Sequence, residues 1–155
     1  MSSFKMVISI LVGLFVVMSL LPYGEKTNPK TNPDLALKAP KKVMRILKKS
    51  CYDCHSNQTK WPWYSSVFPF SWSIKDHVKN GRLALNFDIW NSYSKEKQQQ
   101  KKQKIYTKTG TTMPVAGYLW FHKDAKLSKD EIKIIKDWAS KEEEIIESKI
   151  TQKHF

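Results

Sequence analysis

Two cysteines and a histidine stand together near residue 50, in the sequence Cys51-Tyr52-Asp53-Cys54-His55. Two thiols that are separated by two residues and followed directly by an imidazole have the spacing for covalent attachment of haem c. The thiols add to the two vinyl groups on one edge of the porphyrin, and the adjacent imidazole turns under the ring to bind the iron. The motif therefore predicts thioether anchors at Cys51 and Cys54 and an axial iron ligand at His55.

Other uses of these thiols fit the sequence less well. Cys51 and Cys54 are the only cysteines in the chain, so neither a disulfide framework nor a four-thiolate zinc site is supported. A thioredoxin-like dithiol normally follows a strand in a βαβ pattern, whereas Cys51 follows a lysine-rich stretch with a helical pattern. A zinc site that uses His55 is also disfavoured, because adjacent Cys54 and His55 cannot easily bind one ion. We expect one haem c per chain.

The second axial ligand of the iron is the open question. We favour Met113, because a thioether is a soft, neutral ligand that favours ferrous iron and raises the reduction potential of a His/Met haem. His77 is the rival ligand, and His/His ligation would lower the potential. His122 and His154 rank below both. An iron without a second protein ligand would instead leave an open site for diatomic gases.

The N-terminus carries an apolar run, residues 6–21, which ends at Pro22. Its length lies between that of a signal-peptide core and the ~20 residues that cross a bilayer comfortably. No A-x-A-like cleavage site is evident and no cysteine follows for lipidation, so an uncleaved anchor is favoured over a cleaved signal. We therefore divide the chain into a signal anchor or signal peptide (1–22), a polar linker with two Asn-Pro pairs (23–33) and a haem-binding domain (34–155).

Two amphipathic helices are expected to frame the cysteine motif. The first covers residues 41–49 and carries an apolar stripe of Val43, Ile46 and Leu47. The second begins at a capping box, Ser128 to Glu131, and its apolar face repeats at Ile132, Ile135 and Trp138. Each stripe must be buried, so we expect the two helices to pack against each other.

The segment between these helices is expected to be rich in loops. The aromatic and proline-rich residues 61–72 predict a loop wall, and residues 72–80 predict a short helix that stops at Gly81. Asn86 or Asp88 is expected to cap a further helix that runs to residue 104. The polar second half of that helix predicts a solvated surface, or alternatively a cationic docking surface.

The order of these features resembles class I cytochromes c, in which the first and last helices cross beside the haem edge. The likeness is closer to a small bacterial haem-binding domain family and covers about residues 36–140. Its features are the Cys-x-x-Cys-His-Ser start, Trp61-Pro62-Trp63-Tyr64, Pro69, Ser71-Trp72, His77, Gly81, Leu85-Asn86-Phe87, Met113-Pro114, Tyr118, His122 and Trp138. The resemblance implies an all-α, cytochrome c-like domain around one covalently bound haem.

These features favour a carrier of single electrons on the periplasmic side of the bacterial inner membrane, either anchored or secreted. The basic residues that follow the apolar run argue for the opposite orientation by the positive-inside tendency. The resemblance overrides that tendency, because such proteins receive haem c on the outer side of the membrane. The net charge of +13 predicts an acidic redox partner and, given export, excludes nucleic acid. The alternatives are a peroxidase-like enzyme and a gas or haem sensor, both with an open iron site.

Overall fold

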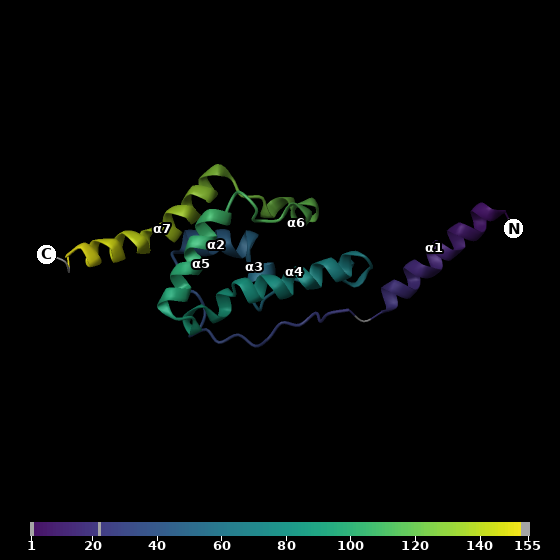
Figure 1. Cartoon of the computed structure of the whole chain (residues 1–155), viewed down its shortest axis with the longest axis horizontal. Helices are drawn as coiled ribbons and strands as arrows, with labels where there is room; N and C mark the ends of the chain where they lie inside the picture. The colour runs from purple at the N-terminus through teal and green to yellow at the C-terminus, as the bar shows by residue number, and fades with distance from the viewer. Residues whose placement is uncertain (1, 22, 153–155) are drawn as a thin grey trace.

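The chain folds into a helical domain with one helix set apart from it (Figure 1). The computed structural model describes residues 2–21 and 23–152, and these residues contain no β-strand. About 67% of the protein is helical, which confirms the predicted all-α class. The elements in chain order are α1 (Ser3–Leu20), α2 (Lys41–Ser50), α3 (Tyr52–His55), η1 (Trp63–Ser66), α4 (Phe70–Ala84), η2 (Phe87–Ser92), α5 (Lys95–Lys108), α6 (Ala116–Phe121), η3 (Lys123–Ala125) and α7 (Lys129–Gln152), where η marks a 3-10 helix.

Helix α1 projects away from the rest of the molecule (Figure 1). It has 18 residues, a mean hydropathy of 2.2 and no buried residue. A helix of this length and composition is suited to cross a membrane, and a signal sequence has the same features. The choice between an anchor and a cleaved signal therefore stays a prediction.

The linker at residues 23–33 is extended and lies along the domain. The Lys75 Nζ donates to the Tyr23 carbonyl at 2.7 Å, and the Asn28 side chain donates to the Thr59 carbonyl at 2.9 Å. Arg82 adds a bond of 2.8 Å to the Thr27 carbonyl. Several hydrogen bonds therefore fix the path by which the chain reaches α2.

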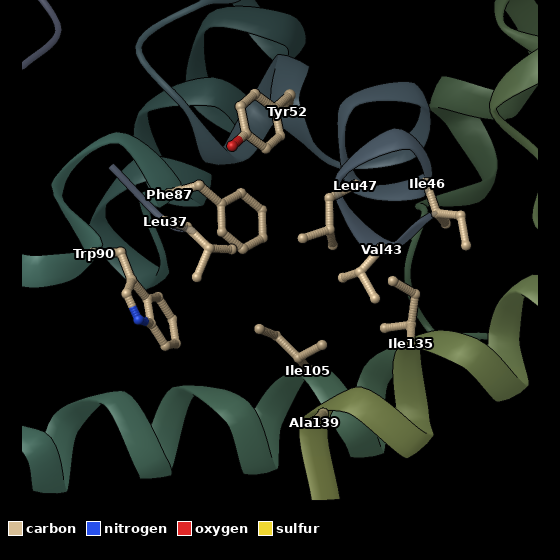
Figure 2. Close-up of a cluster of buried hydrophobic side chains, with 10 residues drawn as sticks. All are labelled: Leu37, Val43, Ile46, Leu47, Tyr52, Phe87, Trp90, Ile105, Ile135 and Ala139. Atoms are coloured by element: carbon tan, nitrogen blue, oxygen red, sulfur yellow. The ribbon is translucent and has the colours of Figure 1, made fainter. Parts of the chain in front are cut away.

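The core forms where α2 meets α5 and α7 (Figure 2). Val43, Ile46 and Leu47 are all buried, and they face Ile135 and Ala139 of α7. The predicted packing of the first and last amphipathic helices is therefore confirmed. Helix α5 closes the core from a third side, and Phe87 stacks on Tyr52 with ring centroids 5.2 Å apart.

The predicted capping box at the start of α7 is also confirmed. The Ser128 hydroxyl accepts from the Glu131 N–H at 3.1 Å, and the Glu131 carboxylate accepts from the Ser128 N–H at 2.9 Å. A salt bridge of 2.6 Å from Lys49 to Glu131 ties α7 to α2. The start of α7 is thus fixed by its own capping box and by the salt bridge to α2.

Two expectations for the middle of the chain were wrong. Helix α4 begins at Phe70 and continues through Gly81 to Ala84, so the predicted loop wall is shorter and Gly81 is not a helix stop. The predicted helix from Asn86 to residue 104 is divided into η2 and α5, because Asn86 caps the first element and Ser94 caps the second. Two capping side chains produce two separate helices here.

Candidate functional site

The cysteine motif forms a short helix, α3, which follows α2 directly. The His55 N–H donates to the Cys51 carbonyl at 2.9 Å, and this turn holds both thiols and the imidazole in one place. The two cysteines are not joined by a disulfide. Burial raises the pKa of Cys51 to about 12, and the nearby Cys54 adds a smaller increase. Burial likewise raises the pKa of Cys54 to about 11, with a smaller increase from Asp53. Both side chains are therefore neutral thiols at physiological pH.

The imidazole of His55 is oriented by backbone carbonyl groups at the end of α4. Its Nδ1 lies 2.9 Å from the Gly81 oxygen and 3.1 Å from the Leu85 oxygen. Carbonyl oxygens only accept hydrogen bonds, so Nδ1 carries the proton and Nε2 keeps its lone pair. Burial lowers the pKa of His55, which keeps the ring neutral. A neutral imidazole with a free Nε2 is the form that binds a metal ion.

Gly81 allows this arrangement because it has no side chain. A Cβ at this position would lie 2.5 Å from the Cys54 carbonyl oxygen and 3.1 Å from the Cys54 Cβ. Any other residue would push α4 away from α3, and with it the carbonyl groups that accept from His55. The close approach of these two backbones therefore requires glycine.

Two adjoining cavities meet at the motif, and both are lined by Cys51, His55, Ala84 and Met113. The first has a volume of about 380 Å³, and its apolar wall consists of the core residues Leu47, Phe87 and Ile105. The second, of about 350 Å³, adds Cys54, His77 and Tyr118. The structure thus brings the four predicted site residues Cys51, Cys54, His55 and Met113 to the walls of one pair of cavities.

A short loop after α5 presents Met113. The Met113 N–H donates to the Lys108 carbonyl at 3.0 Å, and its carbonyl accepts from the Gly110 N–H at 3.0 Å. Gly110 has a φ of +78°, a conformation that glycine adopts readily. The Met113 side chain is 39% exposed. The loop backbone is therefore fixed by hydrogen bonds, and Met113 lies partly exposed at the wall of both cavities.

The other histidines occupy different surroundings. His77 lies on α4, is exposed and lines only the second of the two cavities; its Nδ1 donates to the Ser73 carbonyl at 2.7 Å. His122 lies in neither cavity: its Nε2 is 2.8 Å from the Tyr64 hydroxyl, and its ring stacks on Tyr118. His154 is outside the described residues.

Several residues that the sequence analysis did not assign hold the loop after the motif. The buried Asp88 carboxylate accepts from the Asn57 N–H at 2.8 Å and from the Gln58 side chain at 2.7 Å. The Arg82 guanidinium donates to the Ser56 carbonyl at 2.8 Å and to the Thr59 hydroxyl at 2.8 Å. No pattern in the sequence signalled these contacts, because each joins residues more than twenty positions apart.

Asp53, between the two cysteines, is another residue that the sequence analysis did not assign. Its carboxylate accepts from the Tyr118 hydroxyl at 2.8 Å. This hydrogen bond connects α3 to α6 across the second cavity, since both residues line it. Asp53 therefore helps to set the position of the helix that closes this wall.

The chemistry of the described residues fits a haem. Two neutral thiols, a neutral imidazole with a free nitrogen and a thioether surround cavities with largely apolar walls. The Ser50 hydroxyl is buried on the same wall and has no hydrogen-bond partner among the described residues. A bound group could satisfy this hydroxyl, which supports the use of the cavities as a ligand site.

Comparison with known protein families gives one match. The sequence model for a haem-binding domain matches residues 13–141, which include the cysteine motif, both cavities and most of the helical domain. Comparison with curated protein sequences and with solved structures gave no match.

Proposed function

This chain belongs to the haem-binding domain family, and from that premise we propose that it is a c-type cytochrome that carries single electrons at the bacterial cytoplasmic membrane. The family establishes that the protein binds haem. The covalent attachment, the iron ligands, the electron-carrier role and the location are our proposals. The hydrogen bonds of the His55 imidazole carry the proposal, because they leave a neutral nitrogen free to bind iron beside two thiols.

Cys51 and Cys54 are the proposed anchors. Both thiols line the second cavity, next to His55, and the chain has no other cysteine. Burial raises the pKa of both groups, so they are neutral thiols, and they would hold a haem through two thioether bonds. With a single motif of this kind, the chain would hold one haem.

Met113 is the proposed second axial ligand, and the structure gives a reason to prefer it to His77. The α4 carbonyl groups accept from Nδ1, so α4 lies on the side of the imidazole away from Nε2. His77 rises from this same helix, one turn before Gly81. Met113 instead comes from the separate loop after α5 and lines both cavities with His55. A ligand on the opposite face from His55 is more readily supplied by that loop.

An electron carrier needs a redox centre whose surroundings change little between its two states. The bound haem would supply one reversible one-electron couple at its iron. His55 is held in place by two backbone carbonyl groups, and the Met113 loop by its own hydrogen bonds. If His55 and Met113 both bound the iron, no position would remain for a substrate, and the protein would act as a carrier and not as an enzyme.

The surface beside the first cavity suits an acidic redox partner. Lys104 and Lys108 of α5 are exposed and line that cavity. Positive charge at the edge of a redox site steers an acidic partner toward it, and the effect weakens as salt increases. We propose that the partner docks on this part of α5. The donor and the acceptor would then exchange electrons through the exposed edge of the site.

The proposed location follows from α1 and from the chemistry of attachment. We propose that α1 remains uncleaved and anchors the domain on the outer side of the cytoplasmic membrane. The composition of the helix supports a membrane span. The need for haem c maturation outside the cytoplasm, implied by the family resemblance, supports the orientation.

The proposal is tested on the full chain, expressed in a bacterium that matures c-type cytochromes. We expect an intact mass increased by one haem, a haem that survives denaturation and a low-spin spectrum without carbon monoxide binding. Met113→Leu should lower the reduction potential and open the iron to carbon monoxide, because Leu has no donor atom. His77→Gln is the matched control and should leave the reduction potential and the absence of carbon monoxide binding unchanged.

Three results would contradict different parts of the proposal. An unmodified mass would refute covalent attachment. Carbon monoxide binding by the unmodified chain would refute the carrier function and favour an enzyme or a gas sensor. Loss of the low-spin spectrum in His77→Gln, but not in Met113→Leu, would assign the second ligand to His77.

A further inference from the structure

Four aromatic and apolar side chains form an exposed surface at one end of the domain, which we call the aromatic face. Trp63 is 81% exposed, Trp120 74%, Phe121 51% and Phe70 42%. They come from η1, α4 and α6, segments far apart in the sequence. Surfaces of this kind on a folded domain usually mark a site of interaction.

The aromatic face is a packed assembly of side chains. The Phe121 ring lies 4.6 Å from that of Tyr64 and 5.5 Å from that of Phe70, and Trp63 meets Tyr64 edge-on at 5.7 Å. Beneath it lies a third cavity, of about 210 Å³, whose lining is almost entirely apolar and includes Trp120. Phe70, Trp120 and Phe121 thus line the hollow, and Trp63 lies beside it against the Tyr64 ring.

The aromatic face lies at the end of the domain from which α1 projects. The Phe15 ring of α1 meets the Phe68 ring edge-on at 6.3 Å, and the Tyr23 ring stacks on Trp72 at 4.8 Å. In Figure 1 the start of α4 and the far end of α6 both point toward α1, whereas α7 extends to the opposite end of the molecule. The aromatic face and the helix therefore lie at the same end of the protein.

The contact between Phe15 and Phe68 also shows which part of α1 lies beside this end of the domain. Phe15 lies five residues before the last residue of the helix, which at 1.5 Å per residue is about 7.5 Å from its end. If α1 spans a bilayer, Phe68 lies about 7.5 Å below the end of the span, within the roughly 5–10 Å by which interfacial segments insert their apolar side chains. Tryptophan and other aromatic side chains are enriched in the interfacial layer.

Lysine residues surround the same end of the domain. Lys26 donates to the Ser66 hydroxyl beside η1, and Lys75 donates to the Tyr23 carbonyl at the base of α1. Lys60 and Lys123 are exposed next to the third cavity and the end of α6. Amines beside aromatic rings match a surface of anionic headgroups over acyl chains.

We propose that the aromatic face rests in the interfacial layer of the membrane that α1 spans, with anionic lipid around it. This inference depends on the proposal that α1 is an uncleaved anchor. The domain would then be held at two points, α1 and the aromatic face, rather than swinging on the linker. The lysines of α5 beside the first cavity would face the aqueous phase, where a soluble partner can reach them.

Tryptophan fluorescence tests the proposal on the full chain in nanodiscs. Bromine on the lipid acyl chains quenches tryptophan side chains that enter the membrane, and α1 contains no tryptophan, so the signal reports the domain. We compare emission in brominated and unbrominated nanodiscs that contain phosphatidylglycerol; the ratio cancels quenching by the haem. The double substitution of Trp63 and Trp120 by Phe should remove most of the bromine-dependent quenching. Trp138→Phe is the matched control and should leave this quenching unchanged, because Trp138 lies in α7 beside Lys102 of α5, away from the aromatic face.

The outcomes distinguish this proposal from the ones on which it depends. An intact mass that lacks residues 3–20 would refute the anchor, and the haem spectrum of the same sample tests haem binding separately. A full-length chain with no bromine-dependent quenching, or with quenching that the double substitution leaves unchanged, would refute the membrane contact of the aromatic face. If quenching persists when phosphatidylglycerol is replaced by zwitterionic lipid, the aromatic face contacts the membrane but anionic lipid is not required for that contact.

Discussion

Replacement of Gly81 by alanine should destabilise the protein, although alanine is the better helix former. Gly81 lies inside α4, where Gly→Ala normally stabilises by about 1 kcal/mol. The new Cβ would lie 2.5 Å from the Cys54 carbonyl oxygen, so α3 and α4 must separate by roughly 1 Å to restore an ordinary contact. Overpacking of this kind costs about 1–3 kcal/mol. With both effects, Gly81→Ala should lower the free energy of unfolding by between about zero and 2 kcal/mol, whereas helix propensity alone predicts an increase.

The same displacement should reach His55, the proposed iron ligand, because the Gly81 carbonyl accepts from its Nδ1. The assay is guanidinium unfolding of the mature full-length chain in detergent, with the reduction potential measured on the same sample. Gly117→Ala in α6 is the matched control, since nothing lies within 4 Å of the position of its Cβ. This variant should be neutral or stabilised by up to about 1 kcal/mol, with an unchanged potential. If Gly81→Ala gains stability as Gly117→Ala does and keeps the potential of the unmodified chain, the close approach of α3 and α4 does not require glycine.

Three further predictions concern His55, Gly110 and Asp88. Without attached haem, in the double Cys→Ala chain, stability should fall as pH drops below 6.5: burial lowers the pKa of folded His55, so the unfolded chain takes up the proton first. Urea titrations across pH check this, and a chain that also carries His55→Gln should show a weaker pH dependence. Gly110→Ala should cost about 1–3 kcal/mol, because φ is +78° and the new Cβ would lie 2.7 Å from an Ile132 methyl. Gly110→Ala should also weaken the low-spin spectrum, because the loop carries Met113. An unchanged spectrum and an unchanged midpoint of unfolding would contradict the proposal that this loop supplies the iron ligand. Asp88→Asn should cost about 1–3 kcal/mol, because the buried carboxylate accepts two hydrogen bonds and an amide presents only one oxygen. Thermal denaturation measures the loss, and Asp34→Asn, at an exposed position outside the helices, should show none.

The sequence predicted correctly those helices that are specified by interactions between residues close together in the chain. The stripe in α2 and the capping box of α7 depend on residues three or four positions apart, and both are confirmed. The all-α class and membership of the haem-binding family were predicted as well. The end of α4 was predicted wrongly, because glycine usually stops a helix and no local signal distinguishes a glycine required by a neighbouring helix.

The chemical groups of the site could be read from the residue types and their spacing: two thiols, an adjacent imidazole and a methionine as a candidate partner. Their protonation states and the orientation of the imidazole depend on the folded chain. The proton on Nδ1 of His55 depends on carbonyl groups 26 and 30 residues away, and the thiols stay protonated because the folded core buries them. Likewise, the aromatic face combines three segments that are not neighbours in the chain. Hydrogen-bond direction and burial depend on which distant segments pack together, and that packing is a property of the whole fold.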